Sequence, residues 1–227
     1  MHPVRLTTVL QPIVSLADPG SPRAAEALAR FPDGRSPDTV FAAARETGSA
    51  DRLELACIET HLAALPYLPA EIALALNLST DTVTRHADFL ALRLRAVHRL
   101  IIVELTEESD GDDLAAIGIL RAAGIAIALD DAGAGRTGPQ RIRRVAPDLV
   151  KIDGALLQAA QTVGAARDLV REITAASTAI DAEIVAEGLE SVTDVACAIA
   201  FGASMGQGYA FGAPVPPERF ARRERSA

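Results

Sequence analysis

Short apolar runs alternate along the chain with longer stretches in which apolar residues recur every three to four positions. The short runs predict β-strands, and the longer stretches predict amphipathic helices. The predicted strands lie near Thr8–Val14, Ala24–Arg30, Ile72–Leu78, Leu100–Leu105, Ile125–Leu129, Leu149–Ile152, Ile184–Ala186 and Ala203–Met205. The predicted helices lie near Thr39–Leu65 (as two helices), Asp81–Val97, Asp113–Ala123, Ala165–Ser177 and Val192–Phe201.

Local signals refine the ends of these elements. Gly48 divides the first helical stretch into two. The residues expected as helix N-caps are Asp112, Thr162 and Ser191. A tight loop between the first two strands is predicted at Pro19, Gly20 and Pro22.

The order of the elements predicts the fold class. Strands that alternate with helices are typical of α/β proteins with a parallel sheet, and about eight of them predict a TIM-like (β/α)8 barrel. An open, doubly wound sheet is the alternative, because it holds a similar number of elements. The 227 residues fit one domain. We place it at residues 1–220, followed by a basic, frayed tail at residues 221–227.

The chain is acidic, with a formal net charge of -8 at pH 7, and 49% of its residues are hydrophobic. The apolar content excludes a disordered chain, and the charge disfavours binding to DNA, RNA or anionic membranes. The first residues lack the features of a signal peptide, and no apolar segment is long enough to cross a membrane. The two cysteines form no disulfide framework, so a cytoplasmic protein is expected.

Polar residues lie within or directly after several of the predicted strands. They are Glu26, Asn77, Glu104, Asp130, Asp131, Lys151 and Glu187. In a (β/α)8 barrel the carboxyl ends of the strands meet at one rim. Carboxylates that converge there repel one another, and oxygen ligands with one amide suit Mg²⁺ or Mn²⁺. The alternative is that these residues only cap helices, but Glu26 and Glu104 have apolar neighbours on both sides.

Two of these residues are unique in the chain. Lys151 is the only lysine, and every other basic side chain is arginine or histidine. Asn77 is the only asparagine. A residue type that the chain otherwise avoids is a candidate for a chemical role. Both fall in the set of polar residues at strand ends, which favours a functional site over chance survival on the surface.

In order along the chain, these residues fall in segments that resemble the motifs of the EAL-domain cyclic di-GMP phosphodiesterases. The matching segments are Gln11-Pro12-Ile13-Val14, Glu26-Ala27-Leu28 with Arg30, Pro37 and Phe41, Glu46-Thr47-Gly48, Asn77-Leu78-Ser79, Glu104-Leu105-Thr106-Glu107, Asp130-Asp131, Lys151-Ile152-Asp153, Ala186-Glu187-Gly188-Leu189-Glu190 and Gln207-Gly208-Tyr209. A lone Glu-Ala-Leu triplet carries little weight in an Ala- and Leu-rich chain, whereas the ordered series is specific.

The resemblance implies a modified barrel whose first strand is antiparallel. It also implies hydrolysis of cyclic di-GMP to linear pGpG, with two Mg²⁺ or Mn²⁺ ions, in bacterial second-messenger signalling. The implied metal ligands are Glu26, Asn77, Glu104, Asp130, Asp131 and Glu187. The implied catalytic residues are Lys151, Glu187 and Glu26, and the implied substrate-binding residues are Gln11, Arg30, Asp131 and Gln207.

The loop after the paired aspartates departs from the family pattern DFGTGYSS. It reads Asp131-Ala132-Gly133-Ala134-Gly135-Arg136-Thr137-Gly138. Its extra glycine and its lack of aromatic residues predict a more mobile loop, with Glu107 as its expected anchor. Because misplaced ligands weaken catalysis, the alternative function is a catalytically weak EAL domain that acts as a cyclic di-GMP receptor or a protein-interaction module. A second copy of the chain and sensor or GGDEF-type domains are further candidate partners.

The same loop spells the GxGxxG fingerprint of dinucleotide-binding domains at Gly133, Gly135 and Gly138. Asp153 follows about twenty residues later, as that fingerprint requires. This interpretation is disfavoured, because the paired aspartates would repel a pyrophosphate and Pro139 would break the helix that should begin in the glycine run. The fingerprint also belongs to a first βα unit, and this segment lies in the middle of the chain.

The remaining charged residues predict no site. The arginines expected on a solvated helix face are Arg141, Arg143 and Arg144. The histidines expected to be surface or packing residues are His2, His61, His86 and His98.

Overall fold

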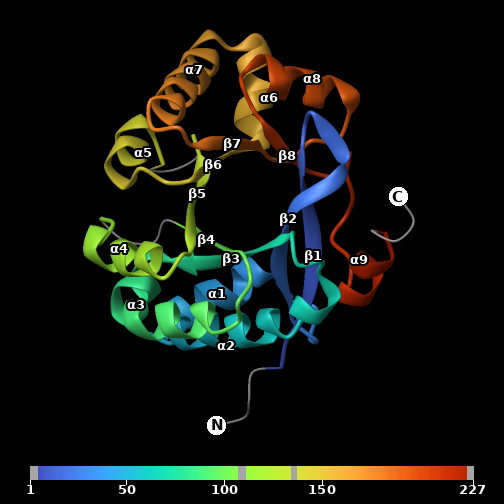
Figure 1. Ribbon diagram of the computed structural model, residues 1–227. Helices are drawn as coiled ribbons and strands as arrows, with labels where there is room; N and C mark the ends of the chain where they lie inside the picture. The colour runs from blue at the N-terminus through green and yellow to red at the C-terminus, as the bar shows by residue number, and fades with distance from the viewer. Residues whose placement is uncertain (1–4, 107–110, 134–136, 224–227) are drawn as a thin grey trace.

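A computed structural model describes residues 5–106, 111–133 and 137–223 of the protein. Within these ranges, eight strands form a closed barrel in sequence order, with helices around its outside (Figure 1). The strands are β1 Thr7–Ser15, β2 Asp18–Arg30, β3 Ala73–Ser79, β4 Ile101–Thr106, β5 Ala126–Ala132, β6 Leu149–Ile152, β7 Glu183–Ala186 and β8 Met205–Gln207. The closed barrel confirms the predicted fold class and rules out the open sheet.

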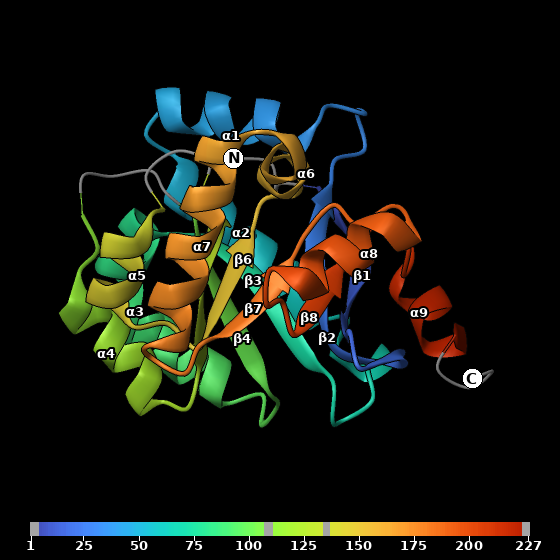
Figure 2. The ribbon, with the colours of Figure 1, turned by 90° about the horizontal axis from the view of Figure 1, so that it is seen from above.

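The helices follow the strands in the order expected for βα units. They are α1 Pro37–Glu46, α2 Ala50–Leu62, the 3-10 helix η1 Leu65–Tyr67, α3 Thr80–Arg95, α4 Leu114–Ala122, α5 Pro139–Val145, α6 Gly154–Thr162, α7 Gly164–Thr178, α8 Val192–Ala200 and α9 Pro217–Arg223. Figure 2 shows α1 lying at the end of the barrel to which β6 runs. Among the described residues no helix has both the length and the apolar character that a membrane crossing requires.

The first strand is antiparallel to both of its neighbours, as the sequence motifs imply. β1 pairs with β2 on one side and with β8 on the other, and the remaining neighbours are parallel. The β1–β2 hairpin turns between Ser15 and Asp18, which are partners in the register. The loop predicted at Pro19–Pro22 is therefore wrong, because these residues belong to β2. Pro22 pairs with Val14 at a register shift, a place in a sheet that tolerates proline.

The barrel interior is filled by a cluster of buried apolar residues with at least one member from every described strand. They are Ile13, Ala24, Ala73, Ala75, Ile102, Ala128, Leu149, Val185 and Met205. Side chains that lie two positions apart on a strand face the same side. A larger apolar cluster, which includes Leu74, Val103 and Leu129 of the strands, packs against the helices on the outside.

Several predicted helix boundaries hold, and others do not. The split at Gly48 separates α1 from α2, and Ser191 caps α8 with a capping box. Thr162 instead ends α6, and Val163 precedes α7 without a side-chain cap bond. The short helices α6 and α9 were not predicted, and α5 was expected only as the helix that carries Arg141, Arg143 and Arg144. α5 begins at Pro139, after its N-cap residue Gly138 and not within the glycine run. Proline suits the first helical position, because that position has no backbone N–H bond to lose.

The predictions for Asp112 and Arg141 are also wrong. Asp113, not Asp112, caps α4 by accepting bonds from the backbone N–H groups of Ala115 and Ala116. Arg141 is buried on α5 and binds the Asp112 carboxylate, which also binds Arg144. Arg143 and Arg144 fit the expected solvated face, since both are exposed, although Arg144 also binds Asp112.

The boundary predicted at residue 220, between the domain and its basic tail, falls inside a helix. α9 runs from Pro217 to Arg223 and therefore crosses the boundary expected at residue 220. Phe220 of α9 is buried in the large outer core, and Figure 1 shows α9 beside β1.

The small side chains inside the barrel predict a position that does not tolerate enlargement. Ala75 of β3 is fully buried in the interior cluster, so Ala75→Leu should lower the free energy of unfolding by about 1–3 kcal/mol through overpacking. Urea unfolding measures this change. The same exchange at the exposed Ala43 of α1 should change it by less than about 0.5 kcal/mol. Equal stability of the two variants would show that the interior has room to spare.

Candidate functional site

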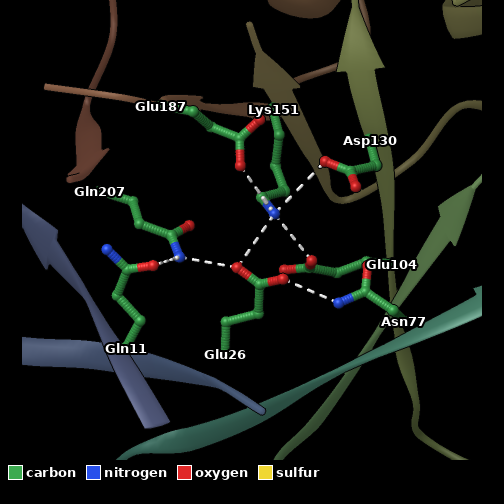
Figure 3. A network of polar contacts seen from close by, with 8 residues as sticks. All are labelled: Gln11, Glu26, Asn77, Glu104, Asp130, Lys151, Glu187 and Gln207. Atoms are coloured by element: carbon green, nitrogen blue, oxygen red, sulfur yellow. Dashed lines mark hydrogen bonds and ion pairs between the residues drawn. The ribbon is translucent and has the colours of Figure 1, made fainter. Parts of the chain in front are cut away.

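On the inner side of the barrel, polar side chains lie two positions from the buried apolar ones, toward one end of the barrel. Along β2, Glu26 lies two residues after Ala24; along β3, Asn77 lies two residues after Ala75. The other members of this layer follow the same step of two: Gln11, Glu104, Asp130, Lys151, Glu187 and Gln207. Because of the pleat, the inner face of each strand is apolar toward one end of the barrel and polar toward the other end. We call these eight residues the polar ring (Figure 3).

Lys151 lies in the middle of the polar ring. Its Nζ is 2.7 Å from Glu104 Oε2 and 2.9 Å from Glu187 Oε1. It is 3.3 Å from Asp130 Oδ1 and 3.5 Å from Glu26 Oε2. The lysine side chain is only 2% exposed. A buried ammonium group is tolerated because carboxylates surround it.

Amide side chains complete the contacts of Glu26. Asn77 Nδ2 donates to Glu26 Oε1 at 2.7 Å, and Gln207 Nε2 donates to Glu26 Oε2 at 2.6 Å. Gln207 Nε2 also lies 3.2 Å from Gln11 Oε1, and Gln11 Nε2 donates to the Gly212 carbonyl at 3.3 Å. Strand pairing produces these contacts, since Gln11 is the partner of Glu26 in the β1–β2 register.

The pKa shifts show that the ring holds excess negative charge. Burial lowers the pKa of Lys151, but the surrounding carboxylates outweigh burial and hold it well above its usual value. Burial and the charge of Glu26 raise the pKa of Glu104 well above its usual value. Burial, with Asp130 and Glu26, raises the pKa of Glu187 to about 8.

Glu26 behaves in the opposite way. Burial raises its pKa, but the Lys151 charge and the hydrogen bonds from Asn77, Gln207 and Lys151 overcome that effect, and the pKa is lowered. One ammonium charge therefore stabilises one buried carboxylate well. The others stay under-compensated, which is the condition that a bound cation relieves.

Two buried oxygens of the ring accept no hydrogen bond from the described part of the protein. They are Gln207 Oε1 and Asp130 Oδ1, and Asp130 Oδ1 has only its ion pair with Lys151 at 3.3 Å. Asp130, Asp131 and Glu187 also place one carboxylate oxygen each within 4.8 Å of one another. Orphaned buried acceptors are rare in proteins, and oxygen-only donors suit hard divalent cations. The residues present therefore fit Mg²⁺ or Mn²⁺.

Asp131 differs from the other acidic residues of the site. It is exposed and has a φ of 51°, in the left-handed region. Aspartate tolerates this conformation better than most residues, but the surrounding structure must hold it. The conformation directs consecutive residues of β5, Asp130 and Asp131, toward one shared group with Glu187.

Two hollows open beside the ring. One, of about 470 Å³, is lined by Glu26, Asn77, Asp130 and Asp131 together with residues of α1 and α2 such as Phe41 and His61. The other, of about 320 Å³, is lined by Gln11, Glu26, Glu187, Glu190, Gln207 and Tyr209, among others. Both include Glu26 and Leu28. The two hollows therefore flank the polar ring on either side of the end of β2.

The structure brings most of the expected site residues together. The exceptions are Arg30, which is exposed and donates to the Ala29 carbonyl at 2.8 Å rather than joining the ring, and Glu107, which lies outside the described residues. Glu26, Asn77, Glu104, Asp130, Lys151, Glu187, Gln11 and Gln207 meet in one place (Figure 3).

Sequence reasoning missed a second polar group in the larger hollow. Ser79 donates to Glu54 Oε2 from its backbone N–H at 2.9 Å and from its hydroxyl at 3.0 Å. His61 Nδ1 lies 2.8 Å from Thr8 Oγ1, and burial lowers the pKa of His61 to about 4. Glu54 and His61 are seven residues apart, on the same buried face of α2 as Cys57 and Ile58. That helical spacing was the available signal.

Comparisons with known proteins agree with this geometry. The EAL domain family model matches residues 2–214. The probable cyclic di-GMP phosphodiesterase PdeB of Escherichia coli (strain K12) is 31% identical over 228 residues, which cover 93% of this chain and 43% of PdeB.

Solved structures share the barrel. The EAL enzyme Bd1971, in its form with cAMP and cyclic di-GMP bound, superposes with a TM-score of 0.83 at 25% identity, over 96% of this chain and 64% of that one. BlrP1 of Klebsiella pneumoniae, in a manganese and cyclic di-GMP complex, superposes with a TM-score of 0.80 at 29% identity, over 94% of this chain and 56% of that one. The chain thus spans less than two thirds of each relative named here. From the match over nearly its whole length, the chain belongs to the EAL domain family.

Proposed function

We propose that this domain hydrolyses one phosphodiester bond of cyclic di-GMP, giving linear pGpG, with two bound divalent cations. The observation that supports this most directly is the polar ring, where buried carboxylates outnumber the ammonium group of Lys151. PdeB is named a probable cyclic di-GMP phosphodiesterase, and BlrP1 forms a manganese and cyclic di-GMP complex. These relatives indicate the substrate and the metal, and the ring supplies ligands suited to both.

The cations would be held by the acidic residues of the site and by the asparagine oxygen. The proposed ligands are Glu26, Asn77, Glu104, Asp130, Asp131 and Glu187. When bound, Mg²⁺ or Mn²⁺ would neutralise phosphate charge and make water a stronger nucleophile. The need for cations also follows from the substrate, because a cyclic dinucleotide with two phosphate charges would otherwise be repelled by the carboxylates.

Lys151, Glu187 and Glu26 have the proposed catalytic roles. The Lys151 ammonium group, already positioned by Glu104 and Glu187, can donate to the attacking water or to a phosphate oxygen as negative charge develops. Glu187 lies at the edge of the smaller hollow, and once bound cations have displaced its own proton it can accept a proton from the water. Glu26 holds both Asn77 and Gln207 by hydrogen bonds, so it orders two neighbours in addition to serving as a ligand.

The hollows on either side of Glu26 suit the two halves of the substrate. Their volumes, about 470 and 320 Å³, lie within the range of small-ligand sites, roughly 300–1,000 Å³. Gln11 and Gln207 line the smaller hollow and would donate hydrogen bonds to the ligand, while Asp131 lines the larger one. Arg30, exposed at the end of β2, can turn from the Ala29 carbonyl to the phosphate that does not react.

We further propose that residues 1–220 provide the catalytic unit and that it works in the cytoplasm. A regulatory setting with sensor or GGDEF-type domains, or a second copy of the chain, is supported by the length of PdeB, of which this chain matches 43%. In the described residues both cysteines are free, which suits a reducing compartment.

Removing one proposed ligand should abolish turnover. We expect the purified domain to convert cyclic di-GMP to pGpG with Mn²⁺ or Mg²⁺, and Glu26→Ala to lower kcat by more than about 100-fold, because even outer-shell partners of metals cost 10–100-fold. Chromatography of the nucleotides measures the product. Glu183→Ala, at the exposed opposite end of β7, is the matched control and should retain the wild-type rate.

The same experiment separates an enzyme from a receptor. A wild-type domain that gives no pGpG at high enzyme concentration, with either metal, would contradict the proposed hydrolysis. Nucleotide binding by calorimetry would then distinguish a cyclic di-GMP receptor from a protein-interaction module.

Without cations, the free energy of unfolding should fall as the pH rises from 6.5 to about 8. The pKa of Glu187 is about 8 in the folded protein against 4.5 ordinarily, so the folded state keeps a proton that the unfolded chain has lost, and stability declines between these values. Below pH 6.5, His61, with a folded pKa of about 4, gives the opposite slope. Urea unfolding in the presence of a chelator measures the trend.

Two comparisons make this pH test specific. Glu187→Gln should reduce the decline above pH 6.5, whereas Glu183→Gln should leave it unchanged. Saturating Mn²⁺ should reverse the decline, because deprotonated ligands bind the metal better. An unchanged slope in Glu187→Gln would show that Glu187 does not carry the extra proton.

A further inference from the structure

A second network of buried polar contacts lies outside the polar ring and connects two loops. Asp112, between β4 and α4, accepts from Arg141 Nε at 3.1 Å and from Arg141 Nη2 at 2.7 Å. The third nitrogen of the same guanidinium, Nη1, donates to Thr137 Oγ1 at 2.8 Å. Thr137 lies between β5 and α5. We call these three residues the loop clamp.

The loop clamp is buried, which makes its contacts specific. The side chains of Asp112 and Arg141 are 2% and 9% exposed, and Thr137 is 1% exposed. Burial raises the pKa of Asp112, but Arg141 and Arg144 outweigh it and hold the pKa below its usual value. The carboxylate is therefore ionised, and a forked arginine contact to it fixes orientation as well as distance.

The loop clamp is connected to the metal ligands through a short piece of backbone. The Gly133 N–H donates to the Thr137 carbonyl at 2.9 Å, so the backbone of Thr137 is bonded directly to that of Gly133, two residues after Asp131. Gly133 has a φ of 96°, and a Cβ there would lie 2.0 Å from Leu156 Cδ2. On the preceding side, the Asp153 N–H donates to the Ala132 carbonyl at 3.4 Å. The backbone after Asp131 is thus held from both sides.

Asp131 needs such support. Its φ of 51° is unfavourable for a residue with a side chain, and a strained residue persists only where its surroundings hold it. The loop clamp lies at the same rim as the polar ring, because β4 and β5 are parallel neighbours and both loops leave their carboxyl ends.

We propose that Asp112, Arg141 and Thr137 are positioning residues that hold Asp130 and Asp131 in place for divalent cations. The proposal rests on the metal site of the proposed function. In this chain no aromatic residue lies between Asp131 and Gly138. The buried ion pair, with its bond to Thr137, instead supports the backbone at Gly133. The residues of the loop clamp touch neither substrate nor metal and act through the backbone of residues 131–133.

Mn²⁺ binding by the purified domain tests the proposal, by isothermal calorimetry and by the spin-resonance signal of free Mn²⁺. Thr137→Val removes one hydroxyl from the loop clamp at nearly constant volume, and Asp112→Asn removes its charge. Each should weaken Mn²⁺ binding roughly tenfold, at the lower end of the range for residues that support metal ligands. Thr137→Ser keeps the hydroxyl and should bind like the wild type, as should Arg143→Ala on the exposed side of α5.

Steady-state kinetics and thermal unfolding separate positioning from stability alone. For Thr137→Val we expect a lower kcat at fixed Mn²⁺, a KM for cyclic di-GMP within about twofold of the wild type, and partial recovery of kcat at high Mn²⁺. A residue that only stabilises the fold would lower the melting temperature and leave the Mn²⁺ affinity of the folded protein unchanged. If Asp112→Asn does not fold, Thr137→Val decides.

The outcomes are distinct for the two proposals. Weaker Mn²⁺ binding in Thr137→Val, with normal binding in Thr137→Ser and Arg143→Ala, supports the loop clamp. Wild-type affinity in Thr137→Val overturns it. A wild-type domain that binds Mn²⁺ but makes no pGpG contradicts the hydrolysis alone, and the binding comparison still decides the loop clamp. A wild-type domain that binds no Mn²⁺ overturns both.

Discussion

Inside the barrel, the Lys151 ammonium group is surrounded by more carboxylate charge than it can compensate. The consequence is visible in opposite pKa shifts within one cluster: the pKa of Glu26 is lowered by Lys151 and its hydrogen bonds, while burial raises the pKa of Glu104 and of Glu187. Buried carboxylates in this arrangement are stable only if protons or cations neutralise their excess negative charge. The choice between the two depends on pH and on metal supply, so the charge state of the ring couples folding to metal binding.

The barrel allows this arrangement because each strand provides apolar packing at one position and a polar side chain at another position of the same face. The apolar positions near the start of a strand fill the interior, with small residues such as Ala75 and Ala128 among them. Two residues further on, the same face carries a polar side chain. The outer faces of the same strands pack against helices, so Leu76 and Val103 stabilise the scaffold without entering the site. Parallel pairing then places neighbouring polar residues side by side, as with Asn77 and Glu104.

Sequence patterns predicted the barrel and the ring well, because both depend on local alternation and on the order of elements. The antiparallel first strand came only from the family resemblance. The short helices α6 and α9 were missed, since each has few turns and little periodicity. A loop was predicted at Pro19–Pro22, where β2 in fact begins, because proline is rare in strands. The burial of Arg141 could not be foreseen, because its partner Asp112 is 29 residues away and only the folded chain brings them together.

The location of that mistaken prediction is informative. From sequence alone, an arginine on a seven-residue helix is expected to be exposed to solvent, because its buried carboxylate partner is distant in the sequence. A buried pair of this kind is stable only when its geometry and further hydrogen bonds compensate for the cost of desolvation. Thr137 supplies one of those bonds. A buried ion pair is a weak source of net stability, but it defines orientation sharply, and orientation is what a strained aspartate beside a metal site requires. Most of the proposed ligands lie on strands, and Glu187 directly follows one, so the register of the whole sheet fixes their positions. The proposed support for Asp131 comes instead from side chains of the loops and of α5, where a different set of side chains can meet the same geometric requirement.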